Sequence, residues 1–324
     1  MVNKIHFGKR IAVRRRKEAW SQADLADKLG VTSQAVSKWE CGNAIPDIDI
    51  LLELSHLYKV TINEMLEDID LLYELTGKET GRSGIAYFVS EQERNYNIEW
   101  ANEIQNGKWI KRNWEHSRSD GTHMDNVGKQ IASCDGVILE IGAGPGGGYM
   151  PYILKANPDT TIIISDLSPT VVREWKAFLD KSLDSPNVYY AVFDFCNMPF
   201  KDNSIDIISD GGGIGNCEGI KAKALKEAFR VLKPGGKLIT STGFVNKETL
   251  AALPEDVQRV LTSECPDVFE DLYEDTVLAG FSKIDSVISG CWYTDDDEST
   301  IADLARSLGV NLKFTSYTRY CTKE

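Results

Sequence analysis

The chain has 324 residues and a net charge of −13, with 42% hydrophobic and 26% charged residues. These values exclude a disordered or fibrous chain, and the length predicts two globular domains. The charge is uneven, because residues 1–40 hold nine Lys/Arg against four Asp/Glu, whereas residues 68–324 hold 26 against 40. We therefore exclude a protein that binds nucleic acid over its whole surface. A basic face on a small N-terminal domain can still neutralise phosphates.

The sequence also limits where the protein acts and what it binds. No apolar run approaches the roughly 20 residues of a membrane span, and the N-terminus lacks a secretory signal pattern, so we expect a cytoplasmic protein. The seven cysteines form no C-x-x-C pair and are expected to be reduced thiols. They form no metal-ligand pattern with the four histidines, so we predict no metal site.

Residues 1–67 are predicted to form an all-α domain of about five helices, because apolar residues recur there at helical spacing. Ser21, with Asp24 three positions later, is typical of a capping box before a helix over Gln22–Leu29. A turn at Gly30–Thr32 leads into a second helix over Ser33–Trp39, whose apolar face joins the same core. Two short helices joined by a tight turn favour a helix presented to the major groove of DNA.

The segment SQADLADKLGVTSQAVSKWECGNAIPDIDILLELS resembles the phage-repressor (XRE) helix-turn-helix family, and the likeness covers residues 4–67. The resemblance implies binding to double-stranded DNA, and to palindromic sites by a homodimer. The residues that it places on DNA are Gln22, Ser33, Gln34, Ser37 and Lys38. The alternative is a helical bundle used only for dimerisation, in which the basic run Arg14–Lys17 is a solvated face.

Residues 68–84 are predicted to be a linker, since TGKETGRSG combines Gly, Ser, Thr and charges. The second domain would then cover residues 85–324. It begins with a mixed helical stretch over residues 85–132 that contains Trp100, Trp109 and Trp114. These tryptophans either pack against the sheet that follows or line a lid over a substrate.

From Gly136 onward, short apolar runs alternate with helical patterns, which predicts an α/β doubly wound, Rossmann-like fold. The expected sheet is mostly parallel and seven-stranded, with strands near residues 137–141, 161–165, 188–193, 205–209, 237–241, 282–293 and 312–321. Ligands of such sheets bind at the carboxyl ends of the strands.

The first of these strands ends in the glycine-rich sequence EIGAGPGGG, residues 140–148. Glycine allows sharp turns and lets a ligand approach the backbone closely. The pattern also satisfies the dinucleotide fingerprint G-x-G-x-x-G, so by itself it leaves the cofactor open. Asp166 closes the second strand, where a carboxylate can accept hydrogen bonds from ribose hydroxyls, and this fits either cofactor.

Later segments favour one cofactor. Asp194-Phe195, MPFKDNSIDIIS and KALKEAFRVLKPGGKLITSTGF resemble the small-molecule branch of class I methyltransferases that use S-adenosylmethionine (SAM). The resemblance covers about residues 134–245. It implies SAM contacts from Glu140, Gly142, Gly144, Gly146, Asp166, Leu167, Asp194, Phe195 and Ser209. Asp206 and the RVLKPGG segment are expected to serve the fold rather than the chemistry.

The sequence departs from the family pattern after the fourth strand, where the glycine-rich run of residues 210–216 stands. This run leaves the shape of the acceptor site open and is compatible with a loop that orders on substrate binding. Methyl transfer from SAM mainly requires orientation of the acceptor, and a group that must lose a proton also needs a base. The candidate bases are His116, His123 and Asp210.

Three functions follow from these residues. The leading hypothesis is a SAM-dependent methyltransferase of a small molecule, fused to a sequence-specific transcriptional regulator domain. The second is a regulator that uses the methyltransferase fold as a SAM sensor without catalysis. The third is an NAD-dependent oxidoreductase. DNA methylation is disfavoured, because neither a D/N/S-P-P-Y tetrapeptide nor a Pro-Cys nucleophile stands where base methylation needs it.

Overall fold

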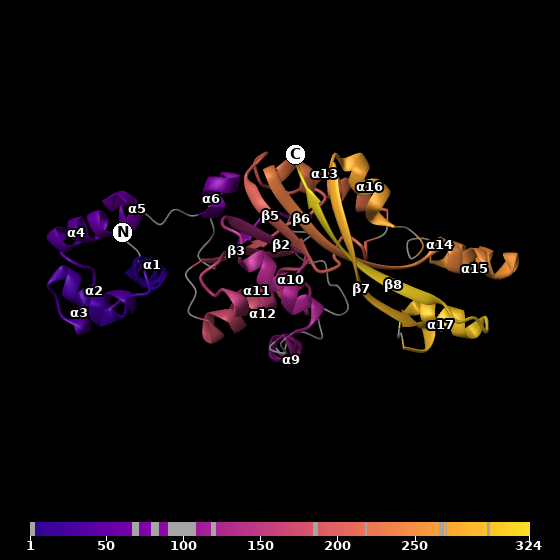
Figure 1. Cartoon of the computed structure of the whole chain (residues 1–324), viewed down its shortest axis with the longest axis horizontal. Coiled ribbons are helices and arrows are strands. Elements are labelled where there is room, and N and C mark those ends of the chain that lie inside the picture. Colours follow the sequence, from indigo (N-terminus) through magenta and orange to yellow (C-terminus); the bar gives the residue numbers. More distant parts are fainter. Residues whose placement is uncertain are drawn as a thin grey trace.

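A computed structural model describes residues 4–66, 71–78, 84–89, 108–117, 121–183, 187–217, 219–265, 269, 271–296 and 299–324. At the N-terminus the helices follow one another over a short stretch of chain (Figure 1). They are α1 (Lys4–Lys17), α2 (Gln22–Leu29), α3 (Ser33–Glu40), α4 (Ile48–Tyr58) and α5 (Ile62–Leu66). The all-α N-terminal domain that the sequence predicts is therefore confirmed.

Local sequence explains how the second and third helices meet. The Ser21 side chain accepts a hydrogen bond from the backbone of Asp24, while the Asp24 carboxylate accepts one from the backbone of Ser21, so the capping box is complete. Helix α2 ends at Gly30, whose φ of 63° suits glycine. Leu25 and Val36 then meet in one buried core with Phe7 and Leu54.

The second domain is built on an eight-stranded sheet with the strand order β1-β4-β3-β2-β5-β6-β8-β7. Strands β1 to β6 are parallel, whereas β8 is antiparallel to both β6 and β7. The strands are β1 (Ala86–Tyr87), β2 (Val137–Ile141), β3 (Thr161–Asp166), β4 (Val188–Val192), β5 (Ile205–Asp210), β6 (Leu232–Val245), β7 (Lys283–Tyr293) and β8 (Lys313–Thr322). This is the mostly parallel α/β sheet that the sequence predicts.

The expected count of seven strands was wrong by one. The extra strand, β1, has two residues and pairs with Ala191 and Val192 of β4 at the edge of the sheet. Two residues carry no readable period, so only the tertiary contact reveals this strand. Strand β6 also begins earlier than expected, at Leu232, because the KPGG segment forms an irregularity in the pairing with β5.

Helices cover both faces of the sheet (Figure 1). On one face the buried cluster joins the sheet to α9 (Lys108–His116), α10 (His123–Ala132), α11 (Met150–Ala156) and α12 (Pro169–Ser182). On the other face a second buried cluster joins the sheet to α6 (Leu71–Thr76), α13 (Lys221–Val231) and α16 (Leu272–Ala279). A smaller cluster packs α14 (Lys247–Ala251), α15 (Glu255–Glu264) and α17 (Thr300–Ser307) on the ends of β6 and β8.

Helix α6 falls inside the predicted linker of residues 68–84, part of which lies outside the described residues. Leu72 and Leu75 of this helix are buried in the same cluster as the sheet, and Lys201 donates its backbone N–H to the carbonyl of Leu75.

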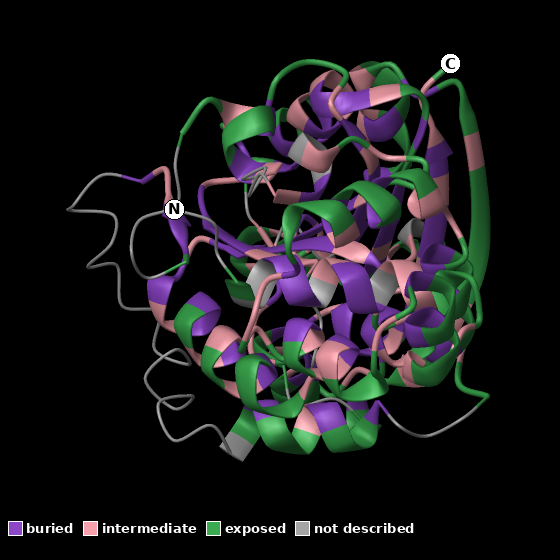
Figure 2. Cartoon of the chain, turned by 90° about the vertical axis from the view of Figure 1, so that its left-hand side faces the viewer, coloured by how far each residue is buried: buried purple, intermediate pink, exposed green. Residues whose placement is uncertain are grey.

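Buried and exposed residues alternate along the helices of the chain (Figure 2). Within the described ranges, no helix is long and apolar enough to cross a membrane.

Candidate functional site

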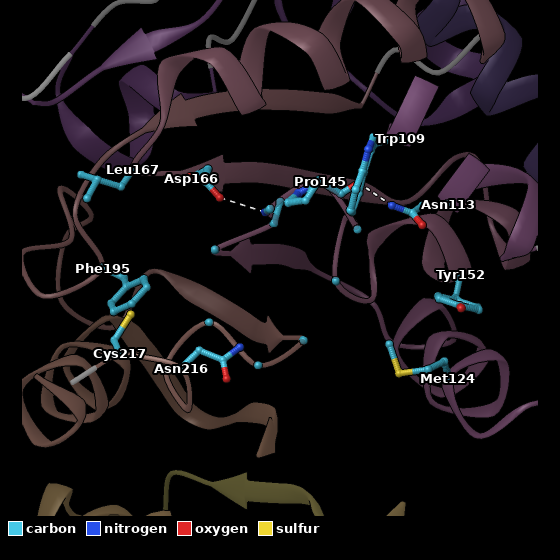
Figure 3. Close-up of a pocket in the computed structure, with 18 of the residues that line it drawn as sticks. Trp109, Asn113, Met124, Pro145, Tyr152, Asp166, Leu167, Phe195, Asn216 and Cys217 are labelled. Atoms are coloured by element: carbon cyan, nitrogen blue, oxygen red, sulfur yellow. Dashed lines mark hydrogen bonds between the residues drawn. The ribbon is translucent and has the colours of Figure 1, made fainter. Parts of the chain in front are cut away.

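A pocket of about 920 Å³ opens at the carboxyl ends of β2, β3, β4 and β5 (Figure 3). This volume lies near the upper end of the range for small-molecule sites, roughly 300–1,000 Å³. The pocket stands where open parallel sheets bind their ligands. It is lined by Trp109, Asn113, His116, Met124, Gly142, Ala143, Gly144, Pro145, Gly146, Gly148, Tyr152, Asp166, Leu167, Asp194, Phe195, Gly211, Gly212, Gly213, Asn216, Cys217 and Ile220.

The glycine-rich loop after β2 lines this pocket. Gly142 and Gly144 have φ values of 57° and 55°, a backbone conformation that glycine adopts without strain. A Cβ on Gly148 would overlap the Glu140 carboxylate, whereas one on Gly146 would meet no atom within 4 Å. Gly148 is therefore required for packing inside the loop, and Gly146 leaves open space above it.

Glu140 lies behind the loop rather than in the pocket. The side chain is fully buried, its Oε1 accepts the backbone N–H of Tyr149 at 3.1 Å, and its Oε2 accepts the hydroxyl of Ser209. Burial raises the pKa of Glu140 well above its ordinary value. Neither Glu140 nor Ser209 lines the pocket, so direct contact between either residue and a cofactor stays a prediction. Their observed contacts hold the loop to β5.

Asp166 faces the pocket from the end of β3. Its Oδ2 accepts the backbone N–H of Gly144 at 2.9 Å, and its Oδ1 accepts that of Ser168 at 2.8 Å. A carboxylate can accept about four hydrogen bonds, so both oxygens keep capacity for a ligand. Burial raises the pKa of Asp166 to about 6. The N-cap of α12 is Ser168, so Asp166 does not cap that helix.

The other predicted cofactor residues gather at one end of the pocket. Leu167, Asp194 and Phe195 all line it, with Leu167 and Phe195 on the same side in Figure 3. The Asp194 Oδ1 accepts the backbone N–H of Cys196 at 2.8 Å, which fixes the turn after β4. The pocket therefore brings together seven of the nine predicted cofactor residues, all except Glu140 and Ser209.

The unusual glycine run after β5 has a packing role. A Cβ on Gly211 would lie 2.6 Å from the Cα of Gly148, and one on Gly213 would lie 3.4 Å from the Cα of Gly142. Two glycine-rich loops thus meet backbone to backbone. Asp210 holds the second loop, because its Oδ1 accepts the N–H groups of Gly212 and Gly213 and its Oδ2 accepts the hydroxyl of Thr240.

Sequence reasoning assigned no role to three residues at the opposite end of the pocket. They are Asn113 of α9, Met124 of α10 and Tyr152 of α11. The Asn113 amide donates to the carbonyl of Pro145 at 2.9 Å, so α9 is tied to the glycine loop. The available signal was the amphipathic pattern of KWIKRNWEH, in which Ile110 and Trp114 are buried.

The tryptophans before the sheet divide between two roles. Trp114 is buried edge-on against Phe178 at 5.7 Å between ring centroids, so it packs on α12. Trp109 is 44% exposed and lines the pocket. Trp100 lies outside the described residues.

The three candidate bases lie in different surroundings. His116 lines the pocket. His123 is not among the lining residues, and its Nε2 is 2.8 Å from the hydroxyl of Thr318. Asp210 is fully buried, and its hydrogen bonds hold the turn after β5. Asp206 bonds Lys233 and the backbone of Val137, the structural role expected of it.

In the N-terminal domain, α3 exposes Ser33, Gln34 and Lys38, while Ser37 is half-buried. Gln22, at the start of α2, is half-buried and donates its side-chain amide to Glu40 at 2.7 Å. Glu40 also accepts two hydrogen bonds from the Arg15 guanidinium, at 2.7 and 3.0 Å. These contacts fix Gln22 beside α3 and leave the outer face of α3 open.

Comparisons with known proteins agree with this geometry. Residues 139–240 match the family model of a methyltransferase domain, and residues 11–65 match that of a helix-turn-helix. The chain is similar to the ubiquinone/menaquinone biosynthesis C-methyltransferase of Rickettsia bellii, with 34% identity over 132 residues, 39% of this chain and 52% of the relative. The corresponding enzyme of Pasteurella multocida is 31% identical over 33% of this chain and 41% of its own. The chain thus spans about half the length of these curated relatives.

Solved structures resemble the second domain at low sequence identity. Phosphoethanolamine N-methyltransferase 2 of Haemonchus contortus has a TM-score of 0.47 and 16% identity, over 70% of this chain and 61% of that one. The YcgJ protein of Bacillus subtilis has a TM-score of 0.45 and 17% identity, over 62% and 99%. The two family matches identify a helix-turn-helix domain within residues 11–65 of this chain and a methyltransferase domain within residues 139–240.

Proposed function

We propose that this protein transfers the methyl group of SAM to a small molecule and regulates transcription by binding DNA through α3. One observation supports the first part of this proposal. The glycine loop and Asp166 line one end of the 920 Å³ pocket, and its second end is lined by other residues. SAM supplies a methyl group on a positively charged sulfur. In the fit that we propose, Asp166 accepts hydrogen bonds from the ribose, and Leu167 and Phe195 flank the adenine.

The residues present suit such a donor. Both oxygens of Asp166 already hold backbone N–H groups, so the carboxylate is oriented before a ligand binds. Gly142, Gly144 and Gly146 place no side chain over the loop, and a Cβ on Gly146 would enter open space. A rigid acceptor of hydrogen bonds beside a bare loop can bind a nucleoside with little ordering cost.

The exposure of Gln34 and Lys38 on α3 supports the DNA-binding part of the proposal. Gln can bond both donor and acceptor groups of adenine in the major groove, and Lys can contact phosphate or guanine. We propose that two copies bind a palindromic site, because one recognition helix reads only a half-site.

Methyl-labelled SAM, incubated with the pure protein and a fractionated cell extract, tests the enzyme proposal. We expect label in a fraction of small molecules. Label in DNA, RNA or protein would refute the small-molecule acceptor. SAM binding without any transfer would favour the alternative function, a regulator that senses SAM.

A further inference from the structure

The pocket has two chemically different ends (Figure 3). Leu167, Phe195 and Cys217 lie at one end, near Asp166. Met124 and Tyr152 lie at the other end, with Trp109 and Asn113 above them. If the donor takes the first end, as the proposed function requires, the second end is left for the methyl acceptor.

The described residues that line the second end are largely aromatic. Trp109, Met124 and Tyr152 supply two aromatic rings and a thioether, which favour a flat apolar ligand. Among the described residues that line this end there is no Asp, Glu, Lys or Arg. A ligand with a full charge would therefore find no oppositely charged partner among the described residues of this end, and its desolvation would be costly.

A buried carboxylate next to Met124 in the sequence does not change this conclusion. Asp125 is buried in α10, and its Oδ2 accepts hydrogen bonds from Lys129 at 2.8 Å and from the backbone of Gly121 at 2.9 Å. Lys155 lies 3.5 Å from its other oxygen. These cations lower the pKa of Asp125 and neutralise its charge, so it cannot serve as the partner of a cationic acceptor.

Two groups at this end can exchange protons, and they differ in their burial. Burial raises the pKa of the Tyr152 phenol, so this group stays protonated and acts as a hydrogen-bond donor. His116 is exposed at the pocket wall, where a proton that it accepts can pass to water. Histidine is the side chain whose ordinary titration range suits a general base near neutral pH.

We propose that the acceptor is a neutral aromatic hydroxyl compound and that His116 is the general base that removes its proton. The inference rests on the proposed function. In the transfer step the phenolic oxygen attacks the methyl carbon while its proton passes to a nitrogen of His116. The carbon–sulfur bond breaks, and its electron pair stays on sulfur. The products are the methyl ether, neutral S-adenosylhomocysteine and protonated His116, which returns its proton to water.

The position of His116 is fixed through Asn113. Both residues belong to α9, and the Asn113 amide bonds the carbonyl of Pro145 in the glycine loop. Ile110 and Trp114 of the same helix are buried in the core. The helix that carries the base is thus held against the loop that carries the donor, which is what an oriented displacement requires.

The experiment uses the full chain, methyl-labelled SAM and two matched probes, catechol and 4-nitrocatechol, at mildly alkaline pH. The nitro compound is ionised under these conditions and needs no base. Since its charge should weaken binding to the wild type and the variant alike, kcat is compared at saturating probe. We expect His116→Gln to lower kcat for catechol roughly 100-fold, the usual range for loss of a general base. The rate with 4-nitrocatechol should change by less than about threefold if the loss is only that of a base.

The controls separate this inference from the proposed function. His56→Gln, on the exposed face of α4, should leave both rates unchanged. Calorimetric titration with SAM tests the proposed function independently, since failure to bind SAM contradicts that function whatever the acceptor. SAM binding with transfer to benzylamine or cyclohexanol, and not to either catechol, would overturn the inference. An equal loss with both catechols would assign His116 a structural role and also overturn it.

Discussion

Gly148 and Glu140 are in direct contact across the glycine-rich loop, because a side-chain carbon on Gly148 would occupy the position of the Glu140 carboxylate. Gly148→Ala therefore has to displace a buried carboxylate that holds Tyr149 and Ser209. The φ of 54° at this position adds strain. We expect a loss of about 2 to 4 kcal/mol in the free energy of unfolding, measured by urea denaturation.

Gly146→Ala is the matched control, since the added carbon meets no protein atom within 4 Å. The stability of this variant should match that of the wild type. Its affinity for SAM should fall, because the new methyl group enters the space assigned to the donor. Unchanged affinity in the Gly146 variant would contradict the placement of SAM over the loop.

Asp166→Ala should weaken SAM binding by about 1 to 3 kcal/mol through lost hydrogen bonds, as isothermal titration calorimetry can measure. The same residue makes binding depend on pH. Burial raises the pKa of Asp166 to about 6, and ribose hydroxyls donate to the charged form, so affinity should fall as pH drops below about 6. In Asp166→Asn this part of the pH dependence should vanish. A wild-type affinity that stays constant from pH 7 to about 5 would argue against the ribose contact.

Asp210→Ala should destabilise the protein by about 1 to 3 kcal/mol, because the N–H groups of Gly212 and Gly213 and the hydroxyl of Thr240 lose their acceptor. Asp210→Asn keeps an oxygen for the turn and should cost less.

Since burial raises the pKa of Asp210 to about 6, the folded state binds its proton more tightly than the unfolded chain. The contribution of Asp210 to the free energy of unfolding therefore decreases as pH rises from about 4 to about 6. Thermal unfolding of Asp210→Asn should show a smaller decrease, and an unaltered pH profile would remove Asp210 as its source.

Replacing Gln34 and Lys38 together by Ala should abolish sequence-specific DNA binding while SAM affinity stays unchanged. Both side chains are exposed on α3, so the fold should not suffer. Selection of binding sites from random duplexes, followed by footprinting, measures the effect. Lys226→Ala, an exposed lysine on α13, is the matched control for loss of charge. A footprint that survives the double substitution would show that α3 is not the recognition helix.

The sequence by itself determined the two domains' fold classes and much of the end of the pocket that we propose for the donor. Ser21 and Gly30 mark the limits of α2 through local hydrogen bonds and a positive φ, which are effects of neighbouring residues. Asp166 and Asp194 could be placed because each ends a buried apolar run, and parallel strands bring their carboxyl ends to one edge. The boundaries of the linker stay a prediction.

The tertiary structure alone decided what depends on contacts between distant residues. The motif predicts Glu140 as a cofactor residue, and only the structure shows that its carboxylate accepts a hydrogen bond from Ser209, 69 positions away. The end of the pocket that we propose for the acceptor joins three helices, and no local pattern predicts that Asn113 bonds Pro145. The choice of His116 over His123 has the same origin. Both are histidines at helix ends, and only the packing of α9 and α10 on the sheet decides which one meets the pocket.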